Sequence, residues 1–357
     1  MAGPKLFSEV TLRGTVLQNR IVVSPMSMYD ATGDGCPTHW HDMHYGNLAV
    51  SGAGLVIVEA TYVSENARST PGDLGLWNEQ QADALGALVG RWRAVSPTRF
   101  GLQISHAGRK GATAVEWRPG EVVDWPLLAP SAIAFDGART PQAMTRDDID
   151  DVLNGFVNSA KLAAQAGFEY LELHAGHGYL LHSFLSPLSN LRNDDYGGSI
   201  ENRMRILLEV CAAVRKVWPD DRILGVRLSC TDWMEGGWDL TQSIMLAGRL
   251  KQLGCDLVTA SSGGISLKQV IRRGPGYQSS FAASIRNEVD LPTLAVGMIH
   301  DPELAEYLVA QGQADLIGVG RAMLYNPRWA WHAARTLGAT PQHAPHFTRA
   351  IKEFHRS

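Results

Sequence analysis

The feature that most constrains the fold is a short apolar run, rich in leucine and β-branched residues, that recurs eight times along the 357 residues. Parallel strands buried on both faces require such runs. Each run ends in small or polar residues and is followed by a stretch with helical character. The predicted strands are Ile21–Met26, Leu55–Ala60, Phe100–His106, Tyr170–Ala175, Ile223–Ser229, Leu257–Ser262, Thr293–Met298 and Leu316–Arg321.

Amphipathic stretches between these runs predict helices. Thr241 is a start signal for one of them, and Asp301 followed by Pro302 opens another. The predicted helices include Asp148–Ala166, Ile200–Val217, Thr241–Gln252 and Pro302–Gln311.

Eight strand-then-helix units in one chain predict an α/β fold, a single-domain (β/α)₈ TIM barrel over residues 1–357. The alternative is an open doubly wound sheet, which usually has fewer strands and carries a glycine fingerprint after an early strand. Gly52-Ala-Gly54 lacks the third glycine and precedes a strand, so it is no such fingerprint.

Four segments lie outside the repeating units. Residues 1–20 predict an N-terminal hairpin with its turn at Arg13-Gly14, and residues 340–357 form a C-terminal tail beyond the eighth unit. Gly108–Thr145 is an insertion after the third strand, and Gly263–Ser280 is another after the sixth. Both insertions are expected on the catalytic face, because loops that follow strands form that face of a barrel.

The charge and cysteine content narrow the classes of function. A net charge of −4 gives no electrostatic reason to expect nucleic acid or a membrane surface as a partner. There is no apolar run of membrane-spanning length and no signal-peptide core, so we expect a cytoplasmic protein. The four cysteines form no C-x-x-C pair, which argues against a metal or iron–sulfur site and favours four reduced thiols.

Glycines and an arginine end the last two predicted strands. The sequences are Ala295-Val-Gly297-Met298 and Gly318-Val-Gly320-Arg321. Barrels commonly bind phosphate at these two strands, where glycines expose backbone N–H groups and arginine adds a cation. Two ordinary tight turns are the alternative, but the position and the arginine favour a phosphate site.

Two polar residues interrupt apolar strands. Arg227 lies inside the fifth predicted strand and Gln103 inside the third. Buried arginine is costly unless it is paired. Either both side chains have their hydrogen bonds satisfied within the barrel layers, or they form a polar edge that faces a heterocycle, and the residues alone leave both readings open.

The strongest chemical pattern follows the fourth strand. His174, His177 and Tyr179 lie close together at its carboxyl end, where they can converge on one small ligand. A zinc pair is one alternative, but it lacks a clear third ligand. Hydrogen-bonded core histidines are a second alternative, which a lone histidine would favour more than this group does.

These residues belong to segments that resemble the signature of the Old Yellow Enzyme family of ene-reductases, most of all its bacterial thermophilic-like branch. The matches extend from Leu6 to about Pro327 and include the two phosphate turns. The segments are Ser24–Tyr29, Gln103–Lys110, Glu172–Tyr179, Phe184–Asn190 and Asp194–Arg203.

The resemblance implies a tightly bound, non-covalent flavin mononucleotide (FMN). Arg227 would lie beside flavin N1 and the C2 carbonyl, where a cation stabilises the charge gained on reduction. The phosphate would be held by Gly297, Gly320 and Arg321. The residues lining the ring would be Ser24, Pro25, Met26, Ser27, Ala60 and Gln103.

The resemblance also implies the reaction. NADPH or NADH would reduce the flavin and leave, and an alkene conjugated to a carbonyl or nitro group would then bind the same face. His174 and His177 would hold the substrate oxygen, flavin N5 would deliver hydride, and Tyr179 would protonate the α-carbon. Tyr29 would flank the substrate.

The sequence departs from the branch at Ser27, where close relatives have cysteine and other branches threonine. The tail carries Phe347-x-Arg349, which resembles an aromatic-x-arginine ending in the branch. It implies a homodimer or homotetramer in which Arg349 reaches a neighbouring subunit's substrate site. A solvated, frayed end is the alternative reading of the tail.

Two other classes of function compete with this one. A flavin-free barrel acting on a phosphorylated substrate, such as an aldolase or isomerase, would explain the phosphate turns. It would not explain the group formed by His174, His177 and Tyr179, and it would want a central lysine or carboxylate base. A non-catalytic barrel that only binds flavin is the other alternative.

Overall fold

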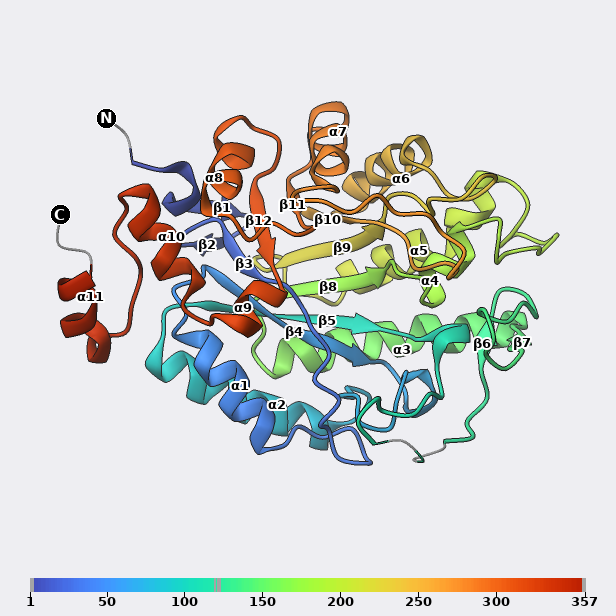
Figure 1. Ribbon diagram of the computed structural model, residues 1–357. Helices are drawn as coiled ribbons and strands as arrows, with labels where there is room; N and C mark the ends of the chain where they lie inside the picture. Colours follow the sequence, from blue (N-terminus) through green and yellow to red (C-terminus); the bar gives the residue numbers. More distant parts are fainter. Residues whose placement is uncertain (1–2, 119, 121–122, 355–357) are drawn as a thin grey trace.

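The computed structural model describes residues 3–118, 120 and 123–354, and its centre is a closed barrel of eight parallel strands (Figure 1). The strands are hydrogen-bonded in the order β10-β11-β12-β3-β4-β5-β8-β9. The predicted (β/α)₈ barrel is therefore confirmed. The bounds are β3 Ile21–Val23, β4 Leu55–Tyr62, β5 Arg99–Ser105, β8 Tyr170–Ala175, β9 Ile223–Ser229, β10 Leu257–Ser261, β11 Thr293–Ala295 and β12 Leu316–Val319.

Several predicted strands extend too far at their carboxyl ends. Residues 24–26, 296–298 and 320–321 leave the strands and form loops or begin a helix. The reason is physical: glycine, proline and polar residues there do not continue the buried ladder but turn toward the mouth of the barrel. The residues that end the strands are consequently available to a ligand.

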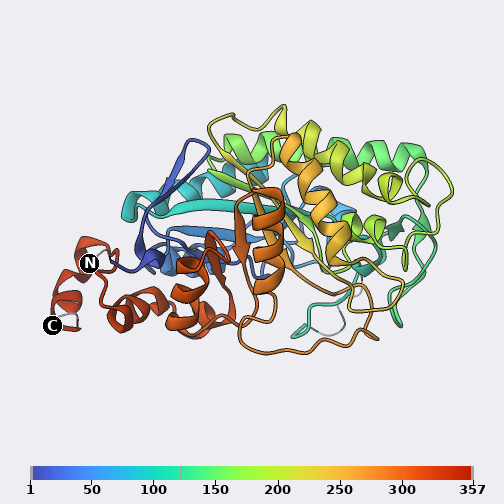
Figure 2. The same ribbon diagram turned by 90° about the horizontal axis from the view of Figure 1, so that it is seen from above.

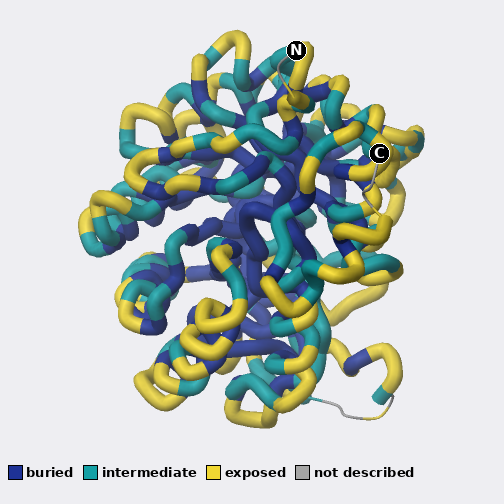
Figure 3. The backbone as a smooth tube through the Cα atoms, turned by 90° about the vertical axis from the view of Figure 1, so that its left-hand side faces the viewer, coloured by how far each residue is buried: buried dark blue, intermediate teal, exposed yellow. Residues whose placement is uncertain are grey.

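Helices surround the barrel, and the backbone is most buried in the centre (Figure 3). The predicted helices are present within two residues, although α6 begins at Leu240 and Asp239, rather than Thr241, caps it by accepting from the Gln242 N–H at 2.9 Å. Asp301 caps α8 as predicted. The bounds are α1 His39–Ala49, α2 Glu79–Val95, α3 Arg146–Gln165, α4 Leu180–Leu185, α5 Ile200–Arg215, α6 Leu240–Gln252, α7 Ser279–Val289, α8 Pro302–Ala310, α9 Arg321–Tyr325, α10 Trp329–Leu337 and α11 Thr348–Phe354.

The predicted N-terminal hairpin is present as β1 (Val10–Leu12) and β2 (Thr15–Leu17), with Arg13 in its turn at a φ of 50°. Its buried residues Leu12 and Leu17 share one apolar cluster with Leu55 and Leu257, the first residues of two barrel strands. The hairpin therefore packs against the amino ends of the strands, opposite to the end where the site is expected.

The two insertions lie next to each other. The first contains the short strands β6 (Leu128–Ala129) and β7 (Gln142–Ala143), and its Asp136 accepts hydrogen bonds from Ser266 Oγ at 2.7 Å and from the Leu267 N–H in the second. Contacts between segments more than a hundred residues apart thus hold both loops in place.

The C-terminal tail forms α11, which lies beside α10 and on the same side of the molecule as the described N-terminal segment (Figures 1 and 2). The ring of Phe347 packs edge-on against Trp331 of α10, with 5.1 Å between the ring centroids.

Within the described part of the chain, none of the helices combines the length and apolar character needed to cross a membrane.

Candidate functional site

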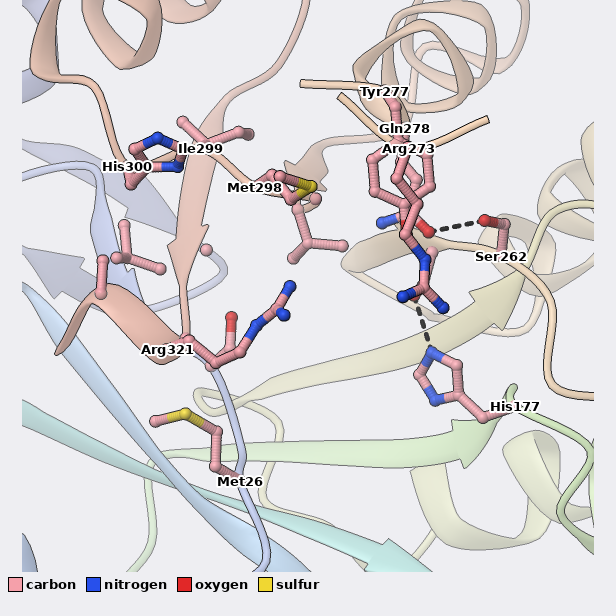
Figure 4. A pocket seen from close by; sticks show the side chains of 18 of the residues that line it. Met26, His177, Ser262, Arg273, Tyr277, Gln278, Met298, Ile299, His300 and Arg321 are labelled. Carbon is pink, nitrogen blue, oxygen red and sulfur yellow. Dashed lines mark hydrogen bonds between the residues drawn. The ribbon is translucent and has the colours of Figure 1, made fainter. Parts of the chain in front are cut away.

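A cavity of about 710 Å³ lies among the carboxyl ends of β3, β9, β10, β11 and β12 (Figure 4). This size suits a cofactor-sized ligand. Three arginines line it, Arg227, Arg273 and Arg321, and no aspartate or glutamate does so within the described chain. The predicted site residues in its wall are Ser24, Pro25, Met26, His177, Arg227, Gly297, Gly320 and Arg321.

The loop ends predicted to bind phosphate meet on one side of this cavity. Gly297 has a φ of +115°, and a Cβ there would lie 2.8 Å from Gln278 Nε2, so a side chain would be both strained and obstructed. The Arg321 side chain extends from the start of α9 into the cavity (Figure 4). The bare backbone at Gly297 and the Arg321 guanidinium, which has no ion-pair partner among the described residues, together suit a phosphate group.

Strand register brings the buried polar residues to one level of the barrel. Ala60 of β4 pairs with Gln103 of β5, and Gln103 pairs with Glu172 of β8. Gln103 Nε2 donates to Glu172 Oε2 at 2.6 Å, and Glu172 also accepts from Tyr170 Oη at 2.9 Å. The Gln103 amide is therefore held with its carbonyl oxygen uncommitted among the described residues.

Arg227 is placed beside His174 by the register of β9 on β8. Burial lowers the pKa of Arg227, and the carboxylate of Glu172 opposes that shift. Its buried Nε has no hydrogen-bond partner in the described part of the chain. Because an unpaired buried donor of this kind is costly, the arrangement fits a polar ligand that supplies the missing acceptor.

His174 and His177, which the sequence predicts to act together, lie side by side. His174 Nε2 and His177 Nδ1 lie 3.3 Å apart, and His177 Nε2 lies 2.8 Å from Ser261 Oγ. Burial is the main cause that holds the pKa of both imidazoles well below the ordinary value, and the nearby Arg227 cation lowers it further. Both rings are therefore neutral at pH 7.

Tyr179 packs edge-on against His174, with 4.9 Å between ring centroids. Burial raises the pKa of Tyr179, and the carboxylate of Asp73 raises it further, so the phenol is protonated at pH 7. Tyr29 has a φ of 53° and a pKa raised to about 12, chiefly by burial and then by Tyr179. The two tyrosines are close enough to interact electrostatically.

A buried pair that sequence reasoning missed supports the turn carrying these residues. His177 and Gly178 both have positive φ, 56° and 77°. The Gly178 N–H donates to His182 Nδ1 at 2.8 Å, and His182 Nε2 lies 3.0 Å from Asp232 Oδ1, with both side chains fully buried. Because His182 Nδ1 accepts a hydrogen bond, the ring proton lies on Nε2, facing the carboxylate.

Known proteins show which family has this arrangement. Residues 5–339 match the model of the family described as NADH:flavin oxidoreductase / NADH oxidase. The chain belongs to this family, that of Old Yellow Enzyme. The expected family and enzyme class, an NAD(P)H:flavin oxidoreductase, are thereby confirmed.

Relatives and solved structures agree with this assignment. An NADPH dehydrogenase of Geobacillus sp. (strain WCH70) is 44% identical over 337 residues, which is 94% of this chain and 95% of that protein. An NADPH dehydrogenase of Bacillus subtilis (strain 168) is 42% identical over 335 residues, 93% and 95% of the two chains. The structure of morphinone reductase superposes with a TM-score of 0.78 at 28% identity, covering 96% of this chain and 92% of that one.

Other residues around the flavin oxidoreductase cavity were also missed. Ser229 and Ser261 end strands β9 and β10, and Ser229 Oγ accepts from the His177 N–H at 2.8 Å. Lys110 donates to the His177 carbonyl at 2.8 Å. The signal available was position, since a hydroxyl that ends a buried strand points at the catalytic face. Arg273, from the second insertion, carried no such signal.

Seven predicted site residues are not among those that line the cavity: Ser27, Tyr29, Ala60, Gln103, His174, Tyr179 and Arg349. Ser27 is half-buried and contacts the Tyr29 hydroxyl, whose pKa it lowers against the dominant effect of burial. Arg349 is exposed on α11, and it is not among the residues lining the cavity of its own chain. Its predicted role in a neighbouring subunit stays a prediction.

Proposed function

We propose that the protein is an FMN-dependent ene-reductase, which uses NADPH or NADH to reduce C=C bonds conjugated to carbonyl or nitro groups. The observation that carries the proposal is the convergence of His174 Nε2 and His177 Nδ1, 3.3 Å apart, with Tyr179 packed against the first ring. Two neutral imidazoles and one protonated phenol around a single point suit polarisation of an oxygen and protonation of a nearby carbon.

The cavity residues fit FMN. Arg321 with the backbone at Gly297 and Gly320 would hold the phosphate, and Arg227 would lie at the pyrimidine edge of the ring. The free carbonyl oxygen of Gln103 suits a ring N–H, while Ser24, Pro25, Met26, Ser27 and Ala60 would complete the wall. When bound, FMN would take hydride from the nicotinamide and pass it to the alkene.

The histidine pair can bind one oxygen only after a tautomer change. His174 Nδ1 accepts from the Gly176 N–H at 3.2 Å, so its proton lies on Nε2. In the ligand-free geometry that proton faces His177 Nδ1. For both rings to donate to a substrate oxygen, His177 must carry its proton on Nδ1 and accept at Nε2 from Ser261. A hydroxyl can donate or accept, so Ser261 permits both states.

Tyr179 would then complete the reaction. Donation from the two imidazoles draws electron density toward the substrate oxygen and leaves the β-carbon electron-poor. After hydride arrives at that carbon, the substrate is enolate-like, and the Tyr179 hydroxyl supplies the proton to the α-carbon. Tyr29 would flank the substrate, and its own raised pKa keeps it a neutral donor.

The relatives named NADPH dehydrogenase support a nicotinamide reductant, which would use the same face of the flavin as the alkene. A single face requires no separate dinucleotide-binding domain.

We further propose a homodimer or homotetramer in which Arg349 of one subunit completes the substrate site of the next.

The deciding experiment is an assay of the purified protein. It should be yellow and release FMN on denaturation, and cyclohexenone should stimulate its oxidation of NADPH. A colourless protein would contradict the cofactor assignment. A yellow protein whose NADPH oxidation does not respond to cyclohexenone or a nitroalkene would be a flavin binder or an oxidase instead.

A further inference from the structure

The cavity is more cationic than its cofactor requires. The chain as a whole has a net charge of −4, yet the described wall of the cavity contains three arginines and no carboxylate. FMN has two electron-rich ends, the phosphate and the N1–C2 edge of the ring, and Arg321 and Arg227 are placed for them. Arg273 remains without a counterpart on the cofactor.

Arg273 enters from a different direction. It belongs to the loop between β10 and α7, and its side chain extends into the cavity toward His177, on the side away from Arg321 (Figure 4). The groups in its vicinity are therefore those proposed to hold the substrate, rather than those proposed to hold the flavin phosphate.

The backbone on both sides of Arg273 is anchored. Before it, Gln269 Oε1 accepts from the Gly264 N–H at 2.6 Å. After it, the Gly276 N–H donates to the Gly297 carbonyl at 2.9 Å, and Ser262 Oγ donates to Gln278 Oε1 at 2.6 Å. The loop is thus tied to the strand ends at two points, which fixes the reach of the Arg273 side chain over the cavity.

The guanidinium itself is uncommitted. Arg273 is exposed and forms neither an ion pair nor a side-chain hydrogen bond with any described residue. An anion can therefore take its planar pair of donors without displacing a protein contact, and guanidinium suits carboxylate and phosphate through two parallel hydrogen bonds.

We propose that Arg273 forms an anion subsite beside His177, which recognises a carboxylate or phosphate on the ligand bound by the histidine pair. This rests on the proposed function, because it assumes that a substrate or nicotinamide occupies that face. Two ligands supply such a group: an enone or enoate that carries a carboxylate, and the reduced dinucleotide with its phosphates.

The direct test measures binding without turnover. In the holoenzyme, 4-hydroxybenzoate and its methyl ester are titrated against flavin absorbance and tryptophan fluorescence. Arg273→Gln should weaken the binding of 4-hydroxybenzoate about 10-fold or more, which is the usual contribution of hydrogen bonds to a charged group. The affinity for the methyl ester should stay unchanged. Arg273→Lys should recover part of the loss. Arg272→Gln is the matched control, because this adjacent exposed arginine does not line the cavity.

Kinetics then identify the source of the anion. A rise in KM confined to 4-oxopent-2-enoate, with its methyl ester unaffected, assigns the subsite to the substrate. A rise for NADPH but not NADH assigns it to the 2′-phosphate, and a rise for both assigns it to the pyrophosphate. Equal behaviour of Arg273→Gln and wild type toward all acids, esters and dinucleotides, within about twofold, overturns the proposal.

Failure of the proposed function would look different. If the wild-type holoenzyme reduced neither the acid nor the ester, the ene-reductase assignment would fall. The difference between 4-hydroxybenzoate and its ester would still report on Arg273.

Discussion

Replacing Asp232 with asparagine tests whether the buried pair His182–Asp232 positions the active turn. Asp232 Oδ2 accepts from Ser186 Oγ at 2.6 Å and from the Trp238 N–H at 2.7 Å, while Oδ1 faces His182. Burial alone would raise the pKa of Asp232, but His182 and these donors outweigh it and hold the pKa below its ordinary value. The group is therefore a carboxylate at neutral pH.

The amide cannot satisfy all of these partners. If its oxygen accepts from Ser186 and Trp238, its NH₂ faces the N–H of His182. If His182 moves its proton to Nδ1, that proton faces the Gly178 N–H. One buried donor is left unpaired in either case, at about 1–3 kcal/mol, and the loss of charge on the remaining bonds adds about 1 kcal/mol. Asp232→Asn should thus lower the free energy of unfolding by about 2–4 kcal/mol.

The functional effect follows from the backbone. Gly178 lies between His177, which holds a left-handed conformation costing about 1–2 kcal/mol, and Tyr179. If His182 moves its proton to Nδ1, or its ring turns away from the amide NH₂, the Gly178 N–H loses its acceptor, so the turn relaxes and the histidine pair no longer converges. Phenolic ligands, which mimic the enolate-like state, should therefore bind the variant more weakly.

Urea denaturation and a phenol titration of the holoenzyme measure the two effects. Ser186→Ala is the control, because it removes one bond to the same carboxylate without disturbing the His182 tautomer. It should cost about 1 kcal/mol and leave phenol affinity unchanged. Wild-type stability and wild-type phenol affinity in Asp232→Asn would refute the reasoning.

Four further predictions test individual residues. Tyr179→Phe should slow flavin reoxidation by cyclohexenone about 10²-fold or more in stopped-flow while sparing reduction by NADPH, and equal losses in both would remove Tyr179 from proton delivery. His174→Ala or His177→Ala should weaken the binding of phenolic ligands, and a double variant that binds phenols with wild-type affinity would contradict this role. Ser27→Cys should shift the flavin reduction potential, and an unchanged potential and spectrum would show that position 27 does not touch the ring. Truncation before Phe347 should raise KM for enones or nicotinamide with FMN retained, whereas a fully active truncated protein would exclude a role for the tail.

The fold could be predicted because the barrel repeats one local rule. Each strand is a short apolar run buried on both faces, so its composition is visible without knowledge of its neighbours. The capping of α6 was harder, since Asp239 and Thr241 are both good caps and only the backbone geometry shows which one accepts from the Gln242 N–H. Strand ends were overextended because apolar residues continue past the strand, as Val296 and Met298 do although they lie in a loop.

The site was predictable where chemistry coincides with a strand end. Arg227, His174 and His177 are conspicuous because polar residues interrupt or close apolar runs. The meaning of Gln103 stayed open in the sequence, and the structure shows why: one half of its amide is bound to Glu172 and the other half is free. The NH₂ group is a satisfied interior amide, whereas a ligand-facing role for the carbonyl oxygen stays a prediction.

Long-range contacts explain what the sequence could not reveal. Arg273 reaches the cavity because its loop is tied to Gly297, and the start of that loop is held by Asp136, a residue of the other insertion. No local pattern around Arg273 encodes either contact. In this barrel the strands position the histidine pair and the residues proposed to hold the cofactor, whereas the contact between the two insertions helps to position the Arg273 side chain beside them. Substitutions in the first insertion should therefore alter preference for anionic ligands through Asp136 without changing the strands that carry the chemistry.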